Sequence, residues 1–376
     1  MTPPRHVRVD VAANLAQTAT FGSSLHSRTP RQGDRMDSVT QACLGAAIGG
    51  VVMPRLGRRA LLIGAALGTL PDLDVLIDYG DAVADYTRHR GFSHSLIVLT
   101  GVATLCAGLA ARWSRTRDLA SFWHWWWLFT LCLATHPLLD AFTTYGTQLL
   151  WPIPLRPVSW HTLFIIDPLY TLPLLIGVIV FAIRPAARRL LAALLGVSCL
   201  YIGFSLGAQA FVEQRLAPFL AQRGMSNDPI LVQPAPLTTL LWRVTVIHDG
   251  AAYEGWVSLL DGDSPPTLAP WPLGDEWQEA AQRTRDGRRL AWFSGPFLRY
   301  EIRREAGRER LLATDIRLGV PGTHPFTFSI AERGDDGKWR PMASERSSSG
   351  RPERAVMQRL LARITSPRVE PITAPE

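Results

Sequence analysis

The sequence predicts a mainly α-helical, multi-spanning membrane bundle with an appended C-terminal β-rich (α+β) soluble domain. Up to about residue 209, long apolar runs alternate with short polar loops. From about residue 210 onward, charged residues recur every few positions and no apolar run approaches membrane length. We therefore expect a leader over 1–35, a membrane-embedded domain over 36–209 and a soluble domain over 210–376.

The leader mixes Pro, Ser, Thr and Arg without periodicity and lacks the apolar core of a signal peptide. We interpret residues 1–35 either as a disordered segment or as a misassigned start, with Met36 as the alternative start.

Six apolar segments follow in the first half, and we expect each of them to be helical. The first two are short and rich in Gly and Ala, so they are either tightly packed spans or a re-entrant pair. The segments cover about 39–53, 60–77, 94–111, 120–139, 168–183 and 189–208.

Arginines predict the orientation of these segments. The loops at 54–59, 112–119 and 184–189 carry three arginines each, and the positive-inside bias places such loops in the cytoplasm. The loops 78–93 and 140–167 and the C-terminal half should then face the periplasm. The five arginines of the leader conflict with this orientation, and a start at Met36 would remove the conflict.

The excess of basic residues is best explained by the orientation of membrane segments, and no nucleic-acid partner is expected. The formal net charge of +7 comes from arginines that flank apolar runs, and Lys338 is the single lysine. The four cysteines are scattered within apolar segments without CxxC spacing, so neither a disulfide framework nor a cysteine metal site is expected.

Beyond residue 210 the pattern changes to the alternation that is typical of strands. Strands separated by Gly, Asp and Pro turns are predicted at 242–248, 253–260, 297–305, 311–318 and 325–332. An amphipathic helix is predicted at 353–365. This half contains no nucleotide loop and no obvious catalytic constellation.

In the membrane half, polar residues gather at segment ends that the predicted topology places on one side. All eleven acids within 1–209 are aspartates, whose short carboxylates suit metal coordination. Polar groups at this depth in a membrane protein are costly unless they serve a site. The residues are Asp37, Gln41, Asp72, Asp74, Asp78, His89, His94, His136, Asp140, His161 and Asp167.

Spacing supports grouping them. His136 and Asp140 are four apart and share a helix face. After Pro71 interrupts the helix, Asp72 and Asp74 are two apart and can project to the same side of an extended segment.

Gly91 allows a tight turn that brings His89 and His94 inward. Each pair alone is more often a structural hydrogen-bonded pair, but together they indicate a site for a divalent Zn, Mn or Fe ion.

We assign the roles as follows. The expected metal ligands are Asp72, Asp74, His94, His136 and Asp140. Residues expected to take part in catalysis are His89 as a general acid or a further ligand, Arg90 as a stabiliser of an anionic group, and Asp167 as an orienting carboxylate. Residues expected to support the ligands are Asp37, Gln41 and His161.

The motifs MDSVTQACLGAAIGG, LGRRALLIGAALGTLPDLD, HRGFSHS, HPLLDAFTTYGTQLLWP and FIIDPLY occur in order over about 36–175. This region resembles the bacterial inner-membrane proteins of domain of unknown function 457, which are described as metal-dependent hydrolases and as LexA-binding. The resemblance implies a multi-spanning inner-membrane protein with a hydrolase assignment. Gln41 stands where relatives often have histidine, which makes a second metal less certain.

The sequence thus predicts a membrane-bound hydrolase that acts on a phosphoester or lipid-linked substrate through water activated by the metal. The lipid class follows from the expected location of the site alone. The alternative is a non-catalytic membrane protein with a structural metal site and a partner-binding C-terminal domain. LexA binding in the cytoplasm fits poorly with a periplasmic C-terminal half.

Overall fold

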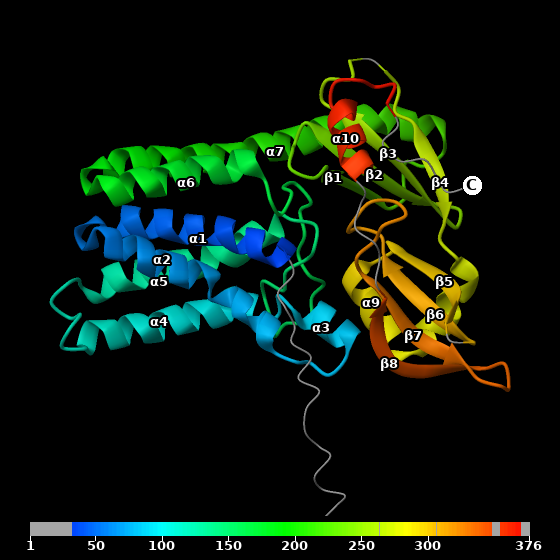
Figure 1. Ribbon diagram of the computed structural model, residues 1–376, viewed down its shortest axis with the longest axis horizontal. Helices are drawn as coiled ribbons and strands as arrows, with labels where there is room; N and C mark the ends of the chain where they lie inside the picture. Colours follow the sequence, from blue (N-terminus) through cyan, green and yellow to red (C-terminus); the bar gives the residue numbers. More distant parts are fainter. Residues whose placement is uncertain (1–31, 263, 306, 348–353, 370–376) are drawn as a thin grey trace, which may run out of the picture. The chain divides into compact units, whose positions relative to one another are not determined.

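The computed structural model describes residues 32–262, 264–305, 307–347 and 354–369, with positions 32–37 and 305 described by their backbone alone (Figure 1). The predicted leader lies outside the described residues, apart from the backbone of its last four positions. By internal contacts the chain divides into Met1–Arg35 and Met36–Glu376, and the features below belong to the second unit.

Each of the six apolar segments is helical in the structure. The second one ends early because Pro71 breaks it, and a 3-10 turn, η2, follows. The elements are α1 (Gln32–Val52), η1 (Pro54–Leu56), α2 (Arg58–Thr69), η2 (Pro71–Leu76), α3 (Ala82–Arg88), η3 (Phe92–His94), α4 (Leu96–Arg112), α5 (Phe122–Ala141), α6 (Pro168–Ile183), η4 (Pro185–Ala187) and α7 (Arg188–Gln222).

By length and apolar composition, one helical stretch of the described residues can cross a membrane. This stretch is Pro185–Gln222, with a mean hydropathy of 2.0 over its best window. Ala82–His94 and Leu96–Arg112 could form a second span, but the chain bends by 46° between them. Two shorter apolar helices are Ser38–Val52, within α1, and Pro168–Ile183, which is α6. The multi-spanning arrangement therefore stays a prediction.

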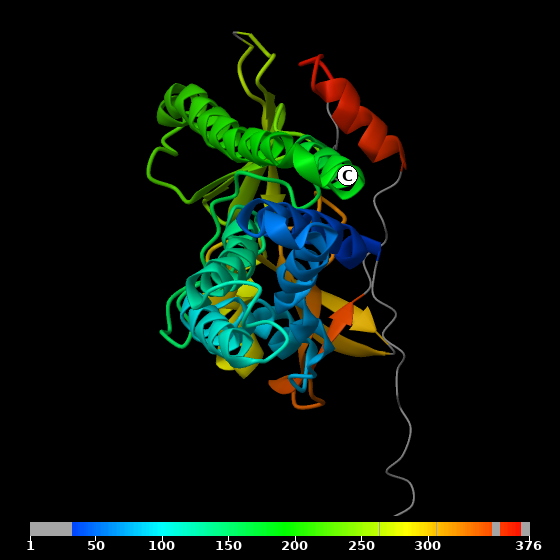
Figure 2. The same ribbon diagram turned by 90° about the vertical axis from the view of Figure 1, so that its left-hand side faces the viewer.

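Close backbone contact joins α1 and α2, which lie side by side in both views (Figures 1 and 2). Each helix carries a GxxxG pattern, Gly45 with Gly49 and Gly64 with Gly68. A Cβ atom on Gly45 would lie 2.1 Å from the carbonyl oxygen of Gly64, and one on Gly49 would lie 2.2 Å from that of Ala60. The helices can approach this closely only because both surfaces lack side chains.

The C-terminal half contains two four-stranded antiparallel sheets, which confirms the predicted α+β class. Each sheet is a meander whose strands pair in chain order. The first holds β1 (Ile230–Pro234), β2 (Leu241–His248), β3 (Ala251–Ser258) and β4 (Leu268–Pro272); the second holds β5 (Leu298–Glu305), β6 (Arg308–Asp315), β7 (Thr327–Arg333) and β8 (Trp339–Ser347). The helices are α8 (Gln278–Arg283), α9 (Arg285–Ser294) and α10 (Arg354–Arg363).

The alternating segments correspond to β2, β3, β5, β6 and β7, and the predicted helix corresponds to α10. Strands β1, β4 and β8 lie at sheet edges and had not been predicted. Edge strands tolerate proline, and β1, β4 and β8 all contain it, so the apolar alternation is weak there. The expected domain boundary at 209/210 falls inside α7, because this helix continues past its apolar part.

Replacing Gly64 with alanine should force α1 and α2 apart. We expect Gly64→Ala to lower the free energy of unfolding by about 1–3 kcal/mol, the usual cost of overpacking. The measurement is thermal or denaturant unfolding in detergent.

Gly101→Ala is the matched control, because a Cβ atom on Gly101 in α4 meets nothing within 4 Å. Alanine there should be neutral or slightly stabilising. Equal stability of the two variants would contradict the proposed contact.

Candidate metal centre

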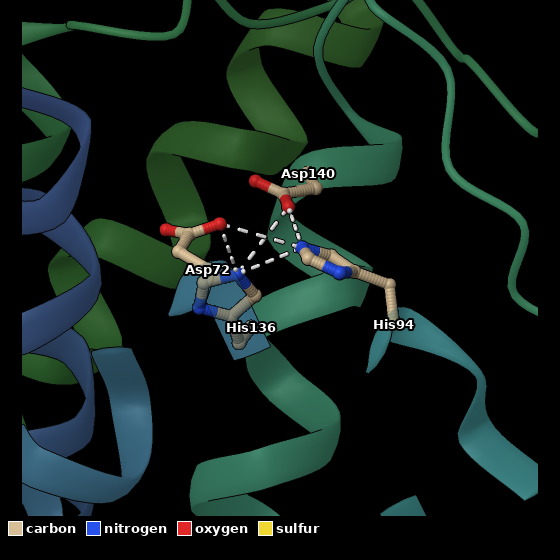
Figure 3. Close-up of side chains that lie close together, drawn as sticks. All are labelled: Asp72, His94, His136 and Asp140. Carbon is tan, nitrogen blue, oxygen red and sulfur yellow. Dashed lines mark hydrogen bonds and ion pairs between the residues drawn. The ribbon is translucent and has the colours of Figure 1, made fainter. Parts of the chain in front are cut away.

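Four side chains from three elements converge on one point: Asp72 of η2, His94 of η3, and His136 and Asp140 of α5 (Figure 3). The Nε2 atoms of His94 and His136 lie 3.1 Å apart. Asp72 Oδ1 lies 3.4 Å from the first and 3.2 Å from the second of these nitrogens. Asp140 Oδ2 lies 3.1 Å and 3.4 Å from the same two atoms.

These spacings fit a divalent metal ion. Zinc ligands that lie about 2.0 Å from the ion at the tetrahedral angle are about 3.3 Å apart, which matches the His–His and His–Asp spacings. Two imidazoles and two carboxylates without a thiolate also suit Mn or Fe, so the donor set leaves the metal identity open.

Hydrogen bonds on the outer side of both imidazoles set their tautomers. His136 Nδ1 lies 2.6 Å from the carbonyl oxygen of Gly68, which can only accept, so Nδ1 carries the proton. The Ser93 hydroxyl donates to Asp74 Oδ2 at 2.6 Å and therefore accepts from His94 Nδ1 at 2.9 Å. Both Nε2 atoms then present a lone pair to the centre, as metal ligands do.

With both imidazoles neutral, four lone-pair acceptors face one another, and the His–His and His–Asp pairs among them lie 3.1–3.4 Å apart. Either an added proton or a cation must compensate them, because His94, His136 and Asp140 are all buried away from water. The metal-like spacing and the outer-side hydrogen bonds favour a cation.

Helix periodicity and a tight turn place three of the four cluster residues. His136 and Asp140 are one helical turn apart on α5, so their side chains share a face. Gly91 precedes the short η3 turn that carries His94, and Ser95 then caps α4 through a hydrogen bond from the Val98 backbone N–H. The histidine is thereby held at the start of a long helix.

Asp74 lies outside the cluster, although it had been expected among the ligands. That expectation assumed an extended segment, in which residues two apart point to the same side. The segment is instead a 3-10 helix, where residues two apart are rotated by about 240°, so Asp72 and Asp74 diverge.

The Asp74 carboxylate instead accepts three hydrogen bonds. The donors are His89 Nδ1 at 2.8 Å, the backbone N–H of Arg90 at 3.0 Å and the Ser93 hydroxyl at 2.6 Å. These three hydrogen bonds supply the compensation that a buried carboxylate needs.

His89 forms a dyad with Asp74. Because the carboxylate accepts from Nδ1, Nε2 of the neutral ring is free to accept a proton. The imidazole lies beside the metal cluster, with its ring centroid 6.0 Å from that of His94, and its side chain is 25% exposed. This geometry suits a general base or acid better than a ligand.

Arg90 is buried and ion-paired, unlike a solvated loop arginine. Its Nε lies 3.3 Å from Asp140 Oδ2, its Nη1 donates to Thr143 Oγ1 at 3.2 Å, and its guanidinium lies 5.1 Å from the ring centroid of Tyr145. Its positive φ of 59° is uncommon for a residue other than glycine. Arg90 thus offsets part of the negative charge of a cluster carboxylate.

Gln41 contacts the cluster from α1. Its Nε2 donates to Asp140 Oδ1 at 3.0 Å and to the carbonyl oxygen of His136 at 3.3 Å. The amide therefore orients a ligand carboxylate and does not enter the cluster.

The structure does not bring Asp167 or His161 to the cluster. Asp167 caps α6 by accepting from the Leu169 N–H and also accepts from the Tyr201 hydroxyl. His161 lies in the loop before α6, where burial and the nearby Arg317 lower its pKa to about 3. The side chain of Asp37 lies outside the described residues.

The second sheet and the residues next to it hold α3, the helix that leads to the site. The Tyr86 hydroxyl of α3 donates to Asp315 Oδ2 at 2.8 Å, and its ring stacks on Phe326 with centroids 4.4 Å apart. The Tyr145 hydroxyl donates to the Tyr86 carbonyl oxygen at 2.7 Å, and the Tyr145 ring contacts Arg90. Packing of the second sheet against α3 thereby extends to His89 and Arg90.

Sequence reasoning missed Gly68, Tyr145 and the part that Ser93 plays in holding His94. Their roles depend on contacts between distant segments, and no local spacing indicates them. The one available signal was the position of Ser93 directly before His94.

Comparison with known proteins supports an inner-membrane location. Residues 36–212 match the family of YdjM inner membrane proteins. The match covers somewhat less than half of the chain and includes all four residues of the cluster. It supports the inner-membrane part of the family resemblance. The hydrolase part stays a prediction.

Two individual proteins are also similar to this chain. It is 39% identical over 113 residues to Inner membrane protein YbcI of Escherichia coli (strain K12), which covers 29% of this chain and 61% of that protein. It is 22% identical over 309 residues to Uncharacterized protein YfhP of Bacillus subtilis (strain 168), covering 78% of this chain and 90% of that protein. The chain thus spans less than two thirds of the length of YbcI. No solved structure matches it.

Replacing His136 should abolish metal binding. We expect the purified protein to bind a divalent ion and His136→Ala to bind it more than 100-fold more weakly, because one ligand is lost. Ser93→Ala should weaken binding by about 10–100-fold, the usual effect of losing a group that orients a ligand. Elemental analysis and titration with Zn²⁺ or Mn²⁺ measure both effects.

His124→Ala is the matched control, because His124 is an exposed histidine of the same helix that contacts Ser121 far from the cluster. Equal metal content in His124→Ala and His136→Ala would rule out the site.

Proposed function

We propose that the protein is an inner-membrane, metal-dependent hydrolase that acts on phosphoesters. The observation that carries this proposal is the shared Asp74 carboxylate, which holds His94 through Ser93 and also holds His89 beside the cluster. A purely structural metal site has no use for a third imidazole that is oriented, partly exposed and free at Nε2.

A divalent cation at the cluster would supply Lewis acidity, which polarises a phosphoryl oxygen and acidifies water. The chain's own residues then carry the proton. His89 Nε2 accepts the proton of the attacking water, and Asp74 stabilises the resulting imidazolium. The water oxygen bonds to phosphorus, the ester P–O bond breaks, and the leaving oxygen takes the proton from His89, so one water is consumed per ester.

Exposure indicates the face at which the reaction takes place. The Asp72 side chain is 20% exposed, whereas those of the other three cluster residues are 1% exposed or less. Substrate therefore reaches the cluster from the side of η2.

His89→Asn separates the proton-transfer role from metal binding. We expect this variant to keep its metal and lose about 10²–10⁴-fold in kcat, with loss of one limb of the pH profile. Phosphate release from p-nitrophenyl phosphate and from extracted membrane lipids, with added metals, measures the rate.

His136→Ala should lose both metal and rate, whereas His124→Ala should keep both. Wild type and His136→Ala behaving alike in this assay would refute the hydrolase.

The second candidate is a non-catalytic membrane protein with a structural metal. It is favoured by the number of protein ligands, since four is the full coordination of structural zinc. Chelation separates the two functions: removal of a structural metal lowers the unfolding temperature, whereas removal of a catalytic metal mainly lowers the rate.

We propose further that the bundle spans the inner membrane several times, with the site and the C-terminal domain on the periplasmic side. Arg58 Nε donates to the Ala182 carbonyl oxygen at 2.6 Å, so two arginine-rich turns lie at the same end of the bundle. That end is the one that positive-inside bias assigns to the cytoplasm. The cluster forms at the other ends of α2 and α5.

Reporter fusions test this orientation. A fusion directly after Gln222 should give periplasmic alkaline phosphatase activity, and a fusion in the loop 113–121 should give cytoplasmic fluorescence. The reverse pattern would overturn the orientation. It would place the C-terminal half in the cytoplasm, where it could bind a partner such as LexA.

A further inference from the structure

The segment that carries Asp72 exposes an unusual number of apolar side chains. Leu70, Leu73, Val75, Leu76 and Ile77 are each 40% or more exposed, and Leu76 reaches 79%. A soluble surface rarely gathers so many in eight residues, and such patches mark interaction or membrane sites.

Two aromatic residues extend this surface. Phe92 of η3 and Trp151 of the loop after α5 are both exposed, and their rings meet edge to face with centroids 6.2 Å apart. The hydrogen bonds from Arg90 and Ser93 to Asp74 join η2 to the η3 turn. We call these seven exposed residues the apolar rim: Leu70, Leu73, Val75, Leu76, Ile77, Phe92 and Trp151.

The chain continues from the apolar rim into further exposed apolar side chains. Directly after η3, helix α4 exposes Ile97, Val102, Leu105 and Leu109, as expected of a helix in contact with lipid. The rim therefore lies where this apolar surface meets the one exposed ligand, Asp72.

We propose that the apolar rim binds the acyl chain of a lipid whose headgroup is a phosphomonoester, so that the ester enters the cluster sideways from the bilayer. This rests on the proposed hydrolase and names its substrate class. A water-soluble phosphoester needs no apolar surface beside the metal, whereas an amphiphile needs apolar contacts on one side and a polar site on the other. Leu73 lies between the two aspartates of η2, so the two surfaces adjoin within three residues.

Kinetics test the proposal through a ratio of substrates. We expect Leu76→Ser to lower the ratio of kcat/KM for phosphatidic acid in mixed micelles to that for p-nitrophenyl phosphate by about tenfold, because an apolar contact with the chain is lost. Leu62→Ser should leave the ratio unchanged, since Leu62 is 72% exposed on the same α2–η2 segment but lies near the start of α2. An unchanged ratio in Leu76→Ser would overturn the proposal.

A binding measurement keeps the test independent of turnover. Two probes, phosphatidic acid and phosphatidylcholine with a diazirine at the same acyl carbon, are photolysed in phosphatidylcholine nanodiscs with Zn²⁺-loaded protein. We expect the phosphatidic acid probe to label peptides of residues 70–77 several-fold more than the phosphatidylcholine probe, and His136→Ala to remove this preference.

The outcomes separate the two proposals. Enrichment without phosphate release would refute the hydrolase and leave the lipid site in place. Hydrolysis of p-nitrophenyl phosphate without enrichment would refute the lipid site alone. Equal labelling by both probes would show ordinary contact with the bilayer. If the rim is not labelled and the protein is a dimer, a second copy of the chain covers the rim. Either result overturns the proposal.

Discussion

The structure depends on one constraint: two carboxylates and two imidazoles face each other in a place from which water is largely excluded, with the His–His and His–Asp pairs 3.1–3.4 Å apart. Lone pairs at this distance repel, and burial removes the screening that would weaken the repulsion. The arrangement therefore needs a positive charge at its centre. The hydrogen bonds around it, from Gln41 to Asp140 and from the two imidazoles outward, hold the ligands in the orientation that a cation requires.

The packing of α1 against α2 helps to hold the cluster residues in place. Gly68 ends the glycine pattern of α2, and its carbonyl oxygen accepts from His136, so the close contact between α1 and α2 also places a group that holds a ligand. A Cβ atom on Gly68 would lie 2.5 Å from the Gln41 carbonyl oxygen. Small residues at this contact thus bring Gln41, Gly68 and His136 within reach of one another.

The C-terminal half takes part in the same arrangement. Asp315, Phe326 and the Tyr86 ring form a buried junction between the second sheet and α3. Helix α3 ends at Arg88, directly before His89 and Arg90, so the position of the sheet bears on both residues. The second sheet therefore supports the site through its contacts with α3.

The sequence by itself determined the features that depend on local periodicity. Apolar length predicted all six helical segments, alternation predicted five of the eight described strands, and the four-residue spacing of His136 and Asp140 predicted a shared helix face. Regular elements repeat their side-chain directions, so spacing alone carries this information.

Only the tertiary structure decided which polar residues meet. Asp72 and Asp74 diverge because the chain after Pro71 forms a 3-10 turn, and the directions of both side chains follow from that turn. Arg90 is buried against Asp140, and Asp167 caps α6 away from the cluster. These outcomes depend on contacts between residues far apart in the chain, where spacing in the sequence carries no information about direction.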